Sequence, residues 1–282
     1  MTRQGLSVKS ACLYSGLPRR SYYYAPAKGA SQRTEPEISC LVRDVCNERP
    51  LYGYRRVTAV LRRQGFQINR KKVHRIMKEN GLLHSAPPKR PHWQLQKGTQ
   101  IAERPNTEWQ ADMTKVWCGA DGWGYLFNVV DCCDRGWAGY SFSVFSGTAE
   151  SELSVERALA GRAPESMRIR GLILRTDGGP QYTSRRFESF LSSAGIRHLV
   201  NRRHTPEDGG IVESFHKTLK AEYLWQHDFE SFQQAEEVVR QAFFDYNENR
   251  VHSGLGYKTP SEYLREVMGK DLSLLAVKVV QK

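Results

Sequence analysis

Three acidic residues, Asp112, Asp177 and Glu213, have types and positions that could do chemistry together. Asp112 stands in an extended segment between residues as apolar as Trp109 and Val116, where burying an acid is costly unless another group compensates its charge. Asp177 ends an apolar run, and the two glycines that follow it permit a sharp turn. Each acid alone is more commonly a surface group or an ion-pair partner. The three together favour one shared metal site.

The chemistry that such a site would support is phosphoryl transfer. Carboxylate oxygens are hard ligands that suit Mg²⁺ or Mn²⁺, and two such ions can activate an attacking oxygen and stabilise a leaving one. We therefore predict two ions per active site, held by the three acids. His204, His216 and His252 lack the spacing of a zinc site, so we expect surface or DNA-contacting roles for them. Tyr182 follows closely after the second acid, but we expect it to pack rather than to act as a nucleophile.

The elements that must position these acids follow from the hydrophobic periodicity. Alternation and short apolar runs predict strands at 107–117, 123–133, 136–145, 171–177 and 196–201. Helical spacing predicts helices at 149–160, 184–193, 211–224 and 232–248. Three antiparallel strands followed by alternating helices and strands indicate an α/β fold, with a mixed five-stranded sheet flanked by helices.

The helix at 211–224 is predicted to bring the third acid to the other two. Its apolar residues fall on one face, and Glu213, His216, Lys217 and Lys220 fall on another. Burying the apolar face on the sheet would leave Glu213 at the edge, where we expect Lys217 and Lys220 to contact DNA phosphates. Three tryptophans in predicted strands are expected in the core: Trp109, Trp123 and Trp137.

Positive charge is concentrated in the first third of the chain. The net charge is +12, and residues 1–105 carry 21 Lys and Arg against 6 Asp and Glu. Helices predicted at 55–64 and 70–80, the second one basic, are typical of a helix-turn-helix that docks in the major groove of double-stranded DNA. A basic helical pair that binds nothing is the alternative. The candidate DNA-binding residues here are Arg55, Arg56, Arg70, Lys71, Lys72, Arg75 and Lys78.

Cysteine spacing and hydropathy exclude other classes of protein. The six cysteines include no Cys-x-x-Cys pair, so we expect reduced, buried thiols rather than a zinc ribbon or a disulfide scaffold. No apolar run is long enough to cross a membrane, and the first residues do not form a signal peptide. We therefore expect the protein to stay in the compartment where it is made.

The sequence around the three acids resembles a known family. Asp112 in Trp-Gln-Ala-Asp-Met-Thr, Asp177 in Arg-Thr-Asp-Gly-Gly-Pro, and Glu213 in Glu-Ser-Phe-His-Lys resemble the DD(35)E core of retroviral integrases. They are still more similar to the OrfB transposase of the IS-three family of bacterial insertion sequences. The stretch 245–260 resembles that family's closing signature, and 52–82 resembles its helix-turn-helix. The chain departs from the family pattern at Gly209-Gly210 and at Val251, and neither departure touches an acid.

The resemblance implies a fold, an activity and partners. The fold would be RNase H-like, and the acids would be the metal ligands of a DDE transposase. This enzyme would cleave a donor strand at the terminal inverted repeats of an insertion sequence and transfer the freed 3′-hydroxyl to target DNA. Two ends must be brought together, which implies a homo-oligomer, at least a dimer on DNA. Family members are often made as a fusion with the protein of an upstream reading frame.

The expected domain boundaries follow from these patterns. We expect a partial helix-turn-helix-like segment at 1–30, a helix-turn-helix DNA-binding domain at 35–84, a linker at 85–104, an integrase catalytic core at 105–265, and a C-terminal tail at 266–282. Two other functions remain open at this point. One is a DNA-binding protein without catalysis, and the other is a nuclease of the RNase H superfamily that cuts DNA without joining it.

Overall fold

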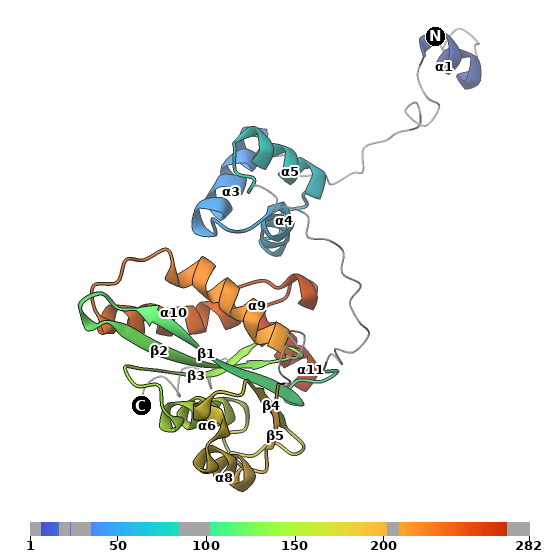
Figure 1. Cartoon of the computed structure of the whole chain (residues 1–282). Helices are drawn as coiled ribbons and strands as arrows, with labels where there is room; N and C mark the ends of the chain where they lie inside the picture. Colours follow the sequence, from blue (N-terminus) through green and yellow to red (C-terminus); the bar gives the residue numbers. More distant parts are fainter. Residues whose placement is uncertain (1–6, 17–22, 24–34, 85–101, 202–208, 270–282) are drawn as a thin grey trace.

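The core of the chain is a five-stranded mixed sheet, as predicted (Figure 1). The computed structural model describes residues 7–16, 23, 35–84, 102–201 and 209–269. The strands are β1 (Glu108–Trp117), β2 (Trp123–Asp131), β3 (Trp137–Ser143), β4 (Ile173–Thr176) and β5 (Arg197–Val200), in the order β3-β2-β1-β4-β5. The first three strands pair antiparallel, whereas β4 pairs parallel with both β1 and β5.

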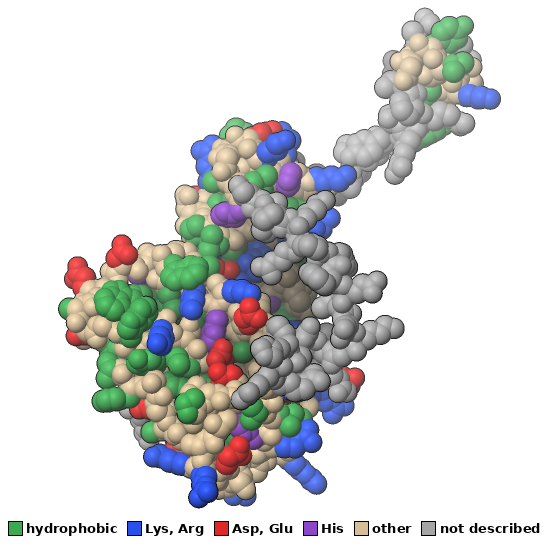
Figure 2. All heavy atoms as spheres, in the orientation of Figure 1, with side chains coloured by type: hydrophobic (Ala, Val, Ile, Leu, Met, Phe, Trp, Pro, Cys, Tyr) green, Lys and Arg blue, Asp and Glu red, His purple; other side chains and the backbone are tan. Residues whose placement is uncertain are grey.

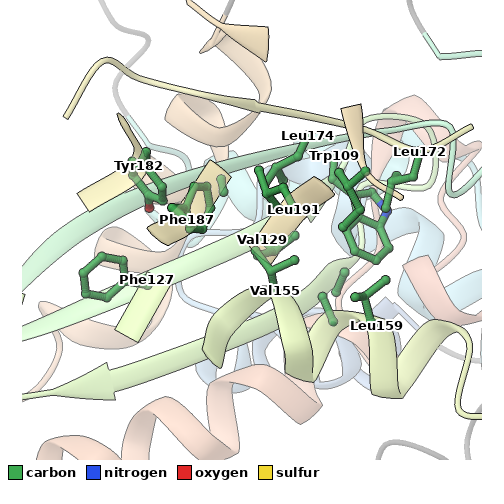
Figure 3. Packing of buried hydrophobic residues seen from close by; sticks show 14 residues of the cluster. Trp109, Phe127, Val129, Val155, Leu159, Leu172, Leu174, Tyr182, Phe187 and Leu191 are labelled. Carbon is green, nitrogen blue, oxygen red and sulfur yellow. The ribbon is translucent and has the colours of Figure 1, made fainter. Parts of the chain in front are cut away.

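Helices cover both faces of the sheet. On one face α6 (Thr148–Arg162) and α8 (Arg185–Ser193) enclose a cluster that includes Trp109, Phe127 and Leu159, shown in Figure 3. On the other face α9 (Gly210–Leu219) and α10 (Phe232–Glu248) pack over Val116, Leu126 and Val130 (Figure 1). Side chains alternate between the two faces along each strand, so one strand contributes residues to both hydrophobic clusters.

Short elements complete the core. They are the 3-10 helices Gly119–Asp121 and Ser253–Leu255, the short helix α7 (Pro180–Thr183), a π-helical segment (Lys220–Leu224) that continues α9, and α11 (Pro260–Met268). Helix α11 was not predicted from the sequence, although residues typical of a helix start are present. Thr259 caps the helix by accepting from the Glu262 amide, Glu262 bonds back to the Thr259 amide, and Pro260 takes the first turn.

Three helices before the core form a separate hydrophobic cluster, and we call them the helical module. They are α3 (Glu35–Glu48), α4 (Tyr54–Arg63) and α5 (Arg70–Glu79). Val57, Leu61, Val73 and Met77 are fully buried between them. Asn69 caps α5, because its side chain accepts a hydrogen bond from the Lys71 amide. The structure thus has the predicted short-turn pair of helices with a basic second member.

The amino-terminal predictions are tested only in part. Helix α1 (Val8–Ser15) is capped by Ser7 and ends at Gly16 in the left-handed conformation, which favours glycine. The rest of the segment expected at 1–30, except Tyr23, lies outside the described residues, as do most of the linker and residues 270–282 of the tail.

Some predictions about burial hold and others are wrong. Trp109, Trp137 and Tyr182 are buried as expected, but Trp123 is 50% exposed and packs edge-on against Trp117 at the end of the β1–β2 hairpin. The reason is that α6 and α8 do not extend over that end of the sheet (Figure 1). All six cysteines are free and five are buried, whereas Cys40 is exposed on α3. No helix among the described residues is long and apolar enough to cross a membrane.

Candidate active site

Asp112 lies within β1, opposite Asn128 of β2. Its Oδ1 accepts a hydrogen bond from the Met113 amide at 2.8 Å. Burial raises the pKa of Asp112 to about 6, and the negative charges of Asp177 and Glu213 act in the same direction, while the Met113 amide and Lys220 oppose them. Asp177 and Glu213 are therefore close enough to Asp112 for their charges to raise its pKa, and the cluster carries excess negative charge.

Asp177 follows directly after the last residue of β4. The parallel pairing of β1 and β4 ends at Ala111 and Thr176, so Asp112 and Asp177 are the next residues along two adjacent strands. Adjacent strands lie about 4.8 Å apart, which brings the two side chains to the same edge of the sheet. Asp177 is exposed, and its Oδ1 accepts a hydrogen bond from the Gly179 amide at 3.0 Å, which fixes the turn.

Glu213 occupies the first turn of α9, as predicted. A side chain of β1 anchors this end of the helix, because Gln110 Oε1 accepts a hydrogen bond from the Val212 amide at 3.0 Å. The Glu213 side chain is 56% exposed, and its Oε1 accepts a hydrogen bond from Lys217 Nζ at 2.6 Å. Gln110 therefore ties the helix that carries the third acid to the strand that carries the first.

All three acids line one pocket with a volume of about 210 Å³. Its walls are Ala111, Asp112, Asp177, Asn201, Gly209, Val212 and Glu213. The buried Oδ1 of Asn201 has no hydrogen-bond partner among the described residues. In that part of the chain, no three His, Cys, Asp or Glu side chains already surround a common point closely enough to hold a metal ion. The acids thus converge on one pocket without closing around its centre.

Comparisons with known proteins show the family of this chain. The family profile described as integrase core domain matches residues 102–206, a second integrase core profile matches 194–260, and an HTH-like domain profile matches 33–91. The transposase InsD for insertion element IS2A/D/F/H/I/K of Escherichia coli is 31% identical over 279 residues, which cover 93% of this chain and 91% of the relative. InsD for element IS2D of strain K12 matches equally well. This chain belongs to the same family of insertion-element transposases.

Some retroviral integrase structures align with this chain at TM-scores below 0.5. A simian T-cell lymphotropic virus intasome in complex with the PP2A regulatory subunit B56 gamma gives a TM-score of 0.49 at 19% identity, covering 82% of this chain and 74% of that one. The HTLV-2 integrase catalytic core domain in complex with magnesium gives a TM-score of 0.43 at 21% identity, covering 57% and 97%. With the integrase core profiles and the observed sheet, the transposase has an RNase H-like fold, and its activity is that of a polynucleotidyl transferase.

A histidine beside the first acid was misjudged from sequence. His216 is buried rather than on the surface, and its Nδ1 lies 3.4 Å from Asp112 Oδ2. Burial, aided by Lys220, lowers the pKa of His216 to about 4, so the ring is neutral at pH 7. Its Nε2 lies 3.0 Å from Asn128 Nδ2, and since that amide nitrogen can only donate, the ring proton belongs on Nδ1, facing the acid. Only the position of the histidine one turn after Glu213 could have indicated this contact.

Of the other two histidines, His252 lies among the described residues and His204 does not. His252 is partly exposed as a whole residue, yet it lies within 3.3 Å of the Arg250 guanidinium rather than on an open DNA-facing surface. Burial and the nearby arginines Arg250, Arg56 and Arg135 lower the pKa of His252 to about 2. The expected surface role is therefore wrong for His252. His204 lies outside the described residues.

The predicted DNA-binding cations divide into two groups. Basic side chains stand on the surface of the helical module (Figure 2), and Arg55, Arg70, Lys71 and Lys78 are exposed there while Lys72 is half-buried. Three other predicted DNA-binding cations already bond an acidic side chain of the protein. Arg56 bonds Glu222 of the core, Arg75 bonds Glu35 and Glu79, and Lys217 bonds Glu213. Lys220 is half-buried and acts on both Asp112 and His216.

Proposed function

We propose that Asp112, Asp177 and Glu213 are the catalytic residues of this transposase and hold two divalent cations, Mg²⁺ or Mn²⁺, in each active site. The observation that carries the proposal is the single pocket that the three acids line from a strand, a strand end and a helix start. Burial first, and then the negative charges of Asp177 and Glu213, raise the pKa of Asp112, and a bound cation would favour its ionised form. The unpartnered oxygen of Asn201 in the same wall suits a cation or one of its waters.

Glu213 would have to turn away from Lys217 to bind a cation in the pocket. Its side chain is more than half exposed and bonded to a lysine that is itself 65% exposed, so exchanging that ion pair costs little. The helix start need not shift, because Val212 stays bonded to Gln110. When bound, the two cations would activate the attacking oxygen and stabilise the leaving oxygen of an in-line displacement. The neutral His216 would hold Asp112 in place from the protein side.

The proposed reaction has two steps. Water cleaves the donor strand at the terminal inverted repeat, and the freed 3′-hydroxyl then attacks target DNA. Lys217, released from Glu213, and Lys220 would contact the phosphates beside the pocket. The exposed cations of the helical module, with Lys72, would contact double-stranded DNA in the domain proposed at 35–84, ahead of a linker at 85–104 and a core at 105–265.

The assembly and the relation to other proteins belong to the same proposal. We infer a homo-oligomer, at least a dimer on DNA, because two element ends must meet in one complex. We also propose that the chain is of the OrfB type and is joined in some products to an upstream-frame protein. Helix α11 runs through residue 268, so the proposed tail at 266–282 would begin with the end of that helix.

The test uses a labelled duplex that carries a terminal inverted repeat. In Mg²⁺ the wild-type protein should nick the end and join it to a second duplex, and Asp177→Asn should abolish both products. Asp228→Asn makes the same chemical change at an exposed residue outside the pocket and should keep both. Undiminished strand transfer by Asp177→Asn would overturn the proposal. Nicking by the wild type without any joined product would instead identify a nuclease.

A further inference from the structure

Two sequence motifs that the active site does not use lie against each other in the structure. One is the closing signature at 245–260, and the other is the segment that joins α3 to α4 in the helical module. Arg49 forms two parallel hydrogen bonds to Asp245, from Nη1 to Oδ2 at 2.5 Å and from Nη2 to Oδ1 at 2.6 Å. Tyr223 donates to the same carboxylate at 2.8 Å and Asn249 at 3.1 Å. Asp245 thus has both oxygens occupied across the contact.

A second ion pair crosses the same contact deeper in the protein. Glu222 accepts from Arg250 at 2.6 and 2.7 Å and from Arg56 of α4 at 3.2 Å. The side chain of Arg250 is 3% exposed and that of Glu222 is 13% exposed. Because buried charges are tolerated only with such partners, Glu222 joins a cation of the module to a cation of the core.

Apolar contacts and a third ion pair surround these charges. Tyr52 is 2% exposed, and its ring faces the guanidinium groups of Arg49 and Arg56 at 5.9 and 5.3 Å from the centroid. Val251 belongs to the hydrophobic cluster of the module although it lies in the closing signature, and Tyr257 packs against that cluster. Arg63 of α4 bonds Glu262 of α11. The contact therefore has a buried centre and a charged rim.

This contact is connected to the active site through one helix. Glu222 and Tyr223 lie in the π-helical segment that continues α9 without a break. The opposite end of α9 carries Glu213 and is tied to β1 by Gln110. The helical module, which lies on the side of the sheet covered by α9 and α10 (Figure 1), thus contacts the element that positions the third acid.

We propose that the closing signature, with Glu222 and Tyr223, is a docking platform for the helical module, and that this platform sets which phosphodiester is cut relative to the sequence the module binds. The proposal rests on the DNA-binding and cleavage functions proposed above. A module on a free tether would present the DNA to the pocket over a range of positions. A module held by three arginine–carboxylate pairs and a buried tyrosine presents it at one position, so Arg49, Asp245, Arg56 and Glu222 are positioning residues.

The experiment maps the cut on a labelled terminal-repeat duplex at single-nucleotide resolution, using the full chain. Arg49→Asp and Asp245→Arg should each reduce cutting at the wild-type phosphodiester about tenfold and spread the remaining cuts to neighbouring positions, the scale of coupling typical of contacting residues. The charge-swapped double variant restores the pair and should return cutting to one position. Glu236→Arg reverses a charge at an exposed residue of the same helix, α10, that does not line the pocket around Arg49 and Asp245, and should leave the cut unchanged.

The outcomes separate this inference from the function on which it rests. Failure of the wild type to nick would overturn the proposed function. A wild type that nicks at one position, with single variants that keep that position, would overturn the docking proposal. Loss of activity without any spread, not rescued by the charge swap, would also overturn it, because that result indicates a contact needed only for stability. If the charge reversals do not fold, Asp245→Asn keeps the shape of the side chain and should still spread the cuts.

Discussion

The pocket and the docking platform treat acidic residues in opposite ways, although one continuous helix reaches both. At the platform, Asp245 and Glu222 each bond an arginine from the helical module, and so does Glu262 just beyond it. Glu222 also bonds a second arginine from the core. In the pocket, by contrast, burial and neighbouring acids raise the pKa of Asp112. Acids whose charge the chain itself neutralises stabilise the fold. Acids left to repel one another are the ones that we propose bind a cation from outside.

The contrast is sharpest between Glu213 and Glu222, which should fail in different assays when changed. Glu213→Gln should reduce strand transfer about a thousandfold, the order seen when a catalytic electrostatic contact is removed, and should leave the unfolding temperature unchanged. Strand-transfer rates and thermal melts measure the two effects. Glu165→Gln, at an exposed glutamate that does not line the pocket, is the matched control. A large drop in stability would show that Glu213 is structural.

Glu222→Gln is the converse change, and its main expected effect is a lower free energy of unfolding. It leaves the nearly fully buried Arg250 without its carboxylate, and breaking a buried ion pair costs about 3–5 kcal/mol. Urea unfolding of the metal-free protein gives the free energy directly. An unchanged unfolding midpoint would mean that the platform contributes nothing to stability, and the distinction between the two regions would fail.

Asp112→Asn should make the metal-free protein more stable, in contrast to Glu222→Gln. The folded protein holds the pKa of Asp112 at about 6, above the ordinary value for an aspartate, so folding disfavours its ionised form. The wild type therefore loses stability as pH rises through this window, and the variant does not. The gain should be about 1–3 kcal/mol at pH 8 and should vanish near pH 3. Melts across this range check the sign, and a variant less stable at pH 8 would contradict it.

The smallest expected effect separates free cations from paired ones. Lys71→Ala removes an exposed cation of α5, so it should lower the slope of log binding constant against log salt by about one unit. Arg56→Ala removes a cation already bonded to Glu222 and should leave that slope unchanged. Titrations of duplex DNA at several salt concentrations measure both slopes. Equal loss of slope in the two variants would show that Arg56 contacts DNA.

The features that local sequence encodes were predicted correctly. Alternation and helical spacing located the five strands and the core helices α6, α8, α9 and α10, because those periods reflect which side of an element is buried, whereas α7 and α11 were not predicted. The positions of Asp112 in mid-strand, Asp177 after a strand and Glu213 in a first turn followed from the same patterns. Their place in one pocket came from the resemblance and the spacing together.

The features that sequence did not reveal depend on contacts between distant residues. Arg56 was expected on DNA, but it bonds Glu222, 166 positions further along the chain, and no local pattern encodes that choice. His216 was expected at the surface because its helix face was read as open, whereas Asn128 of β2 and Asp112 of β1 enclose it. Trp123 was expected in the core because strand aromatics usually pack, but no helix reaches it.

The most direct test of the central claim is the structure of the protein with a terminal-repeat duplex in Mn²⁺, recorded at a wavelength where manganese scatters anomalously. We expect two manganese peaks in the pocket. One should lie between Asp112 and Asp177, and Glu213 should turn away from Lys217 to bind the other. Anomalous density elsewhere, with Glu213 still bonded to Lys217 and the three carboxylates apart, would contradict it.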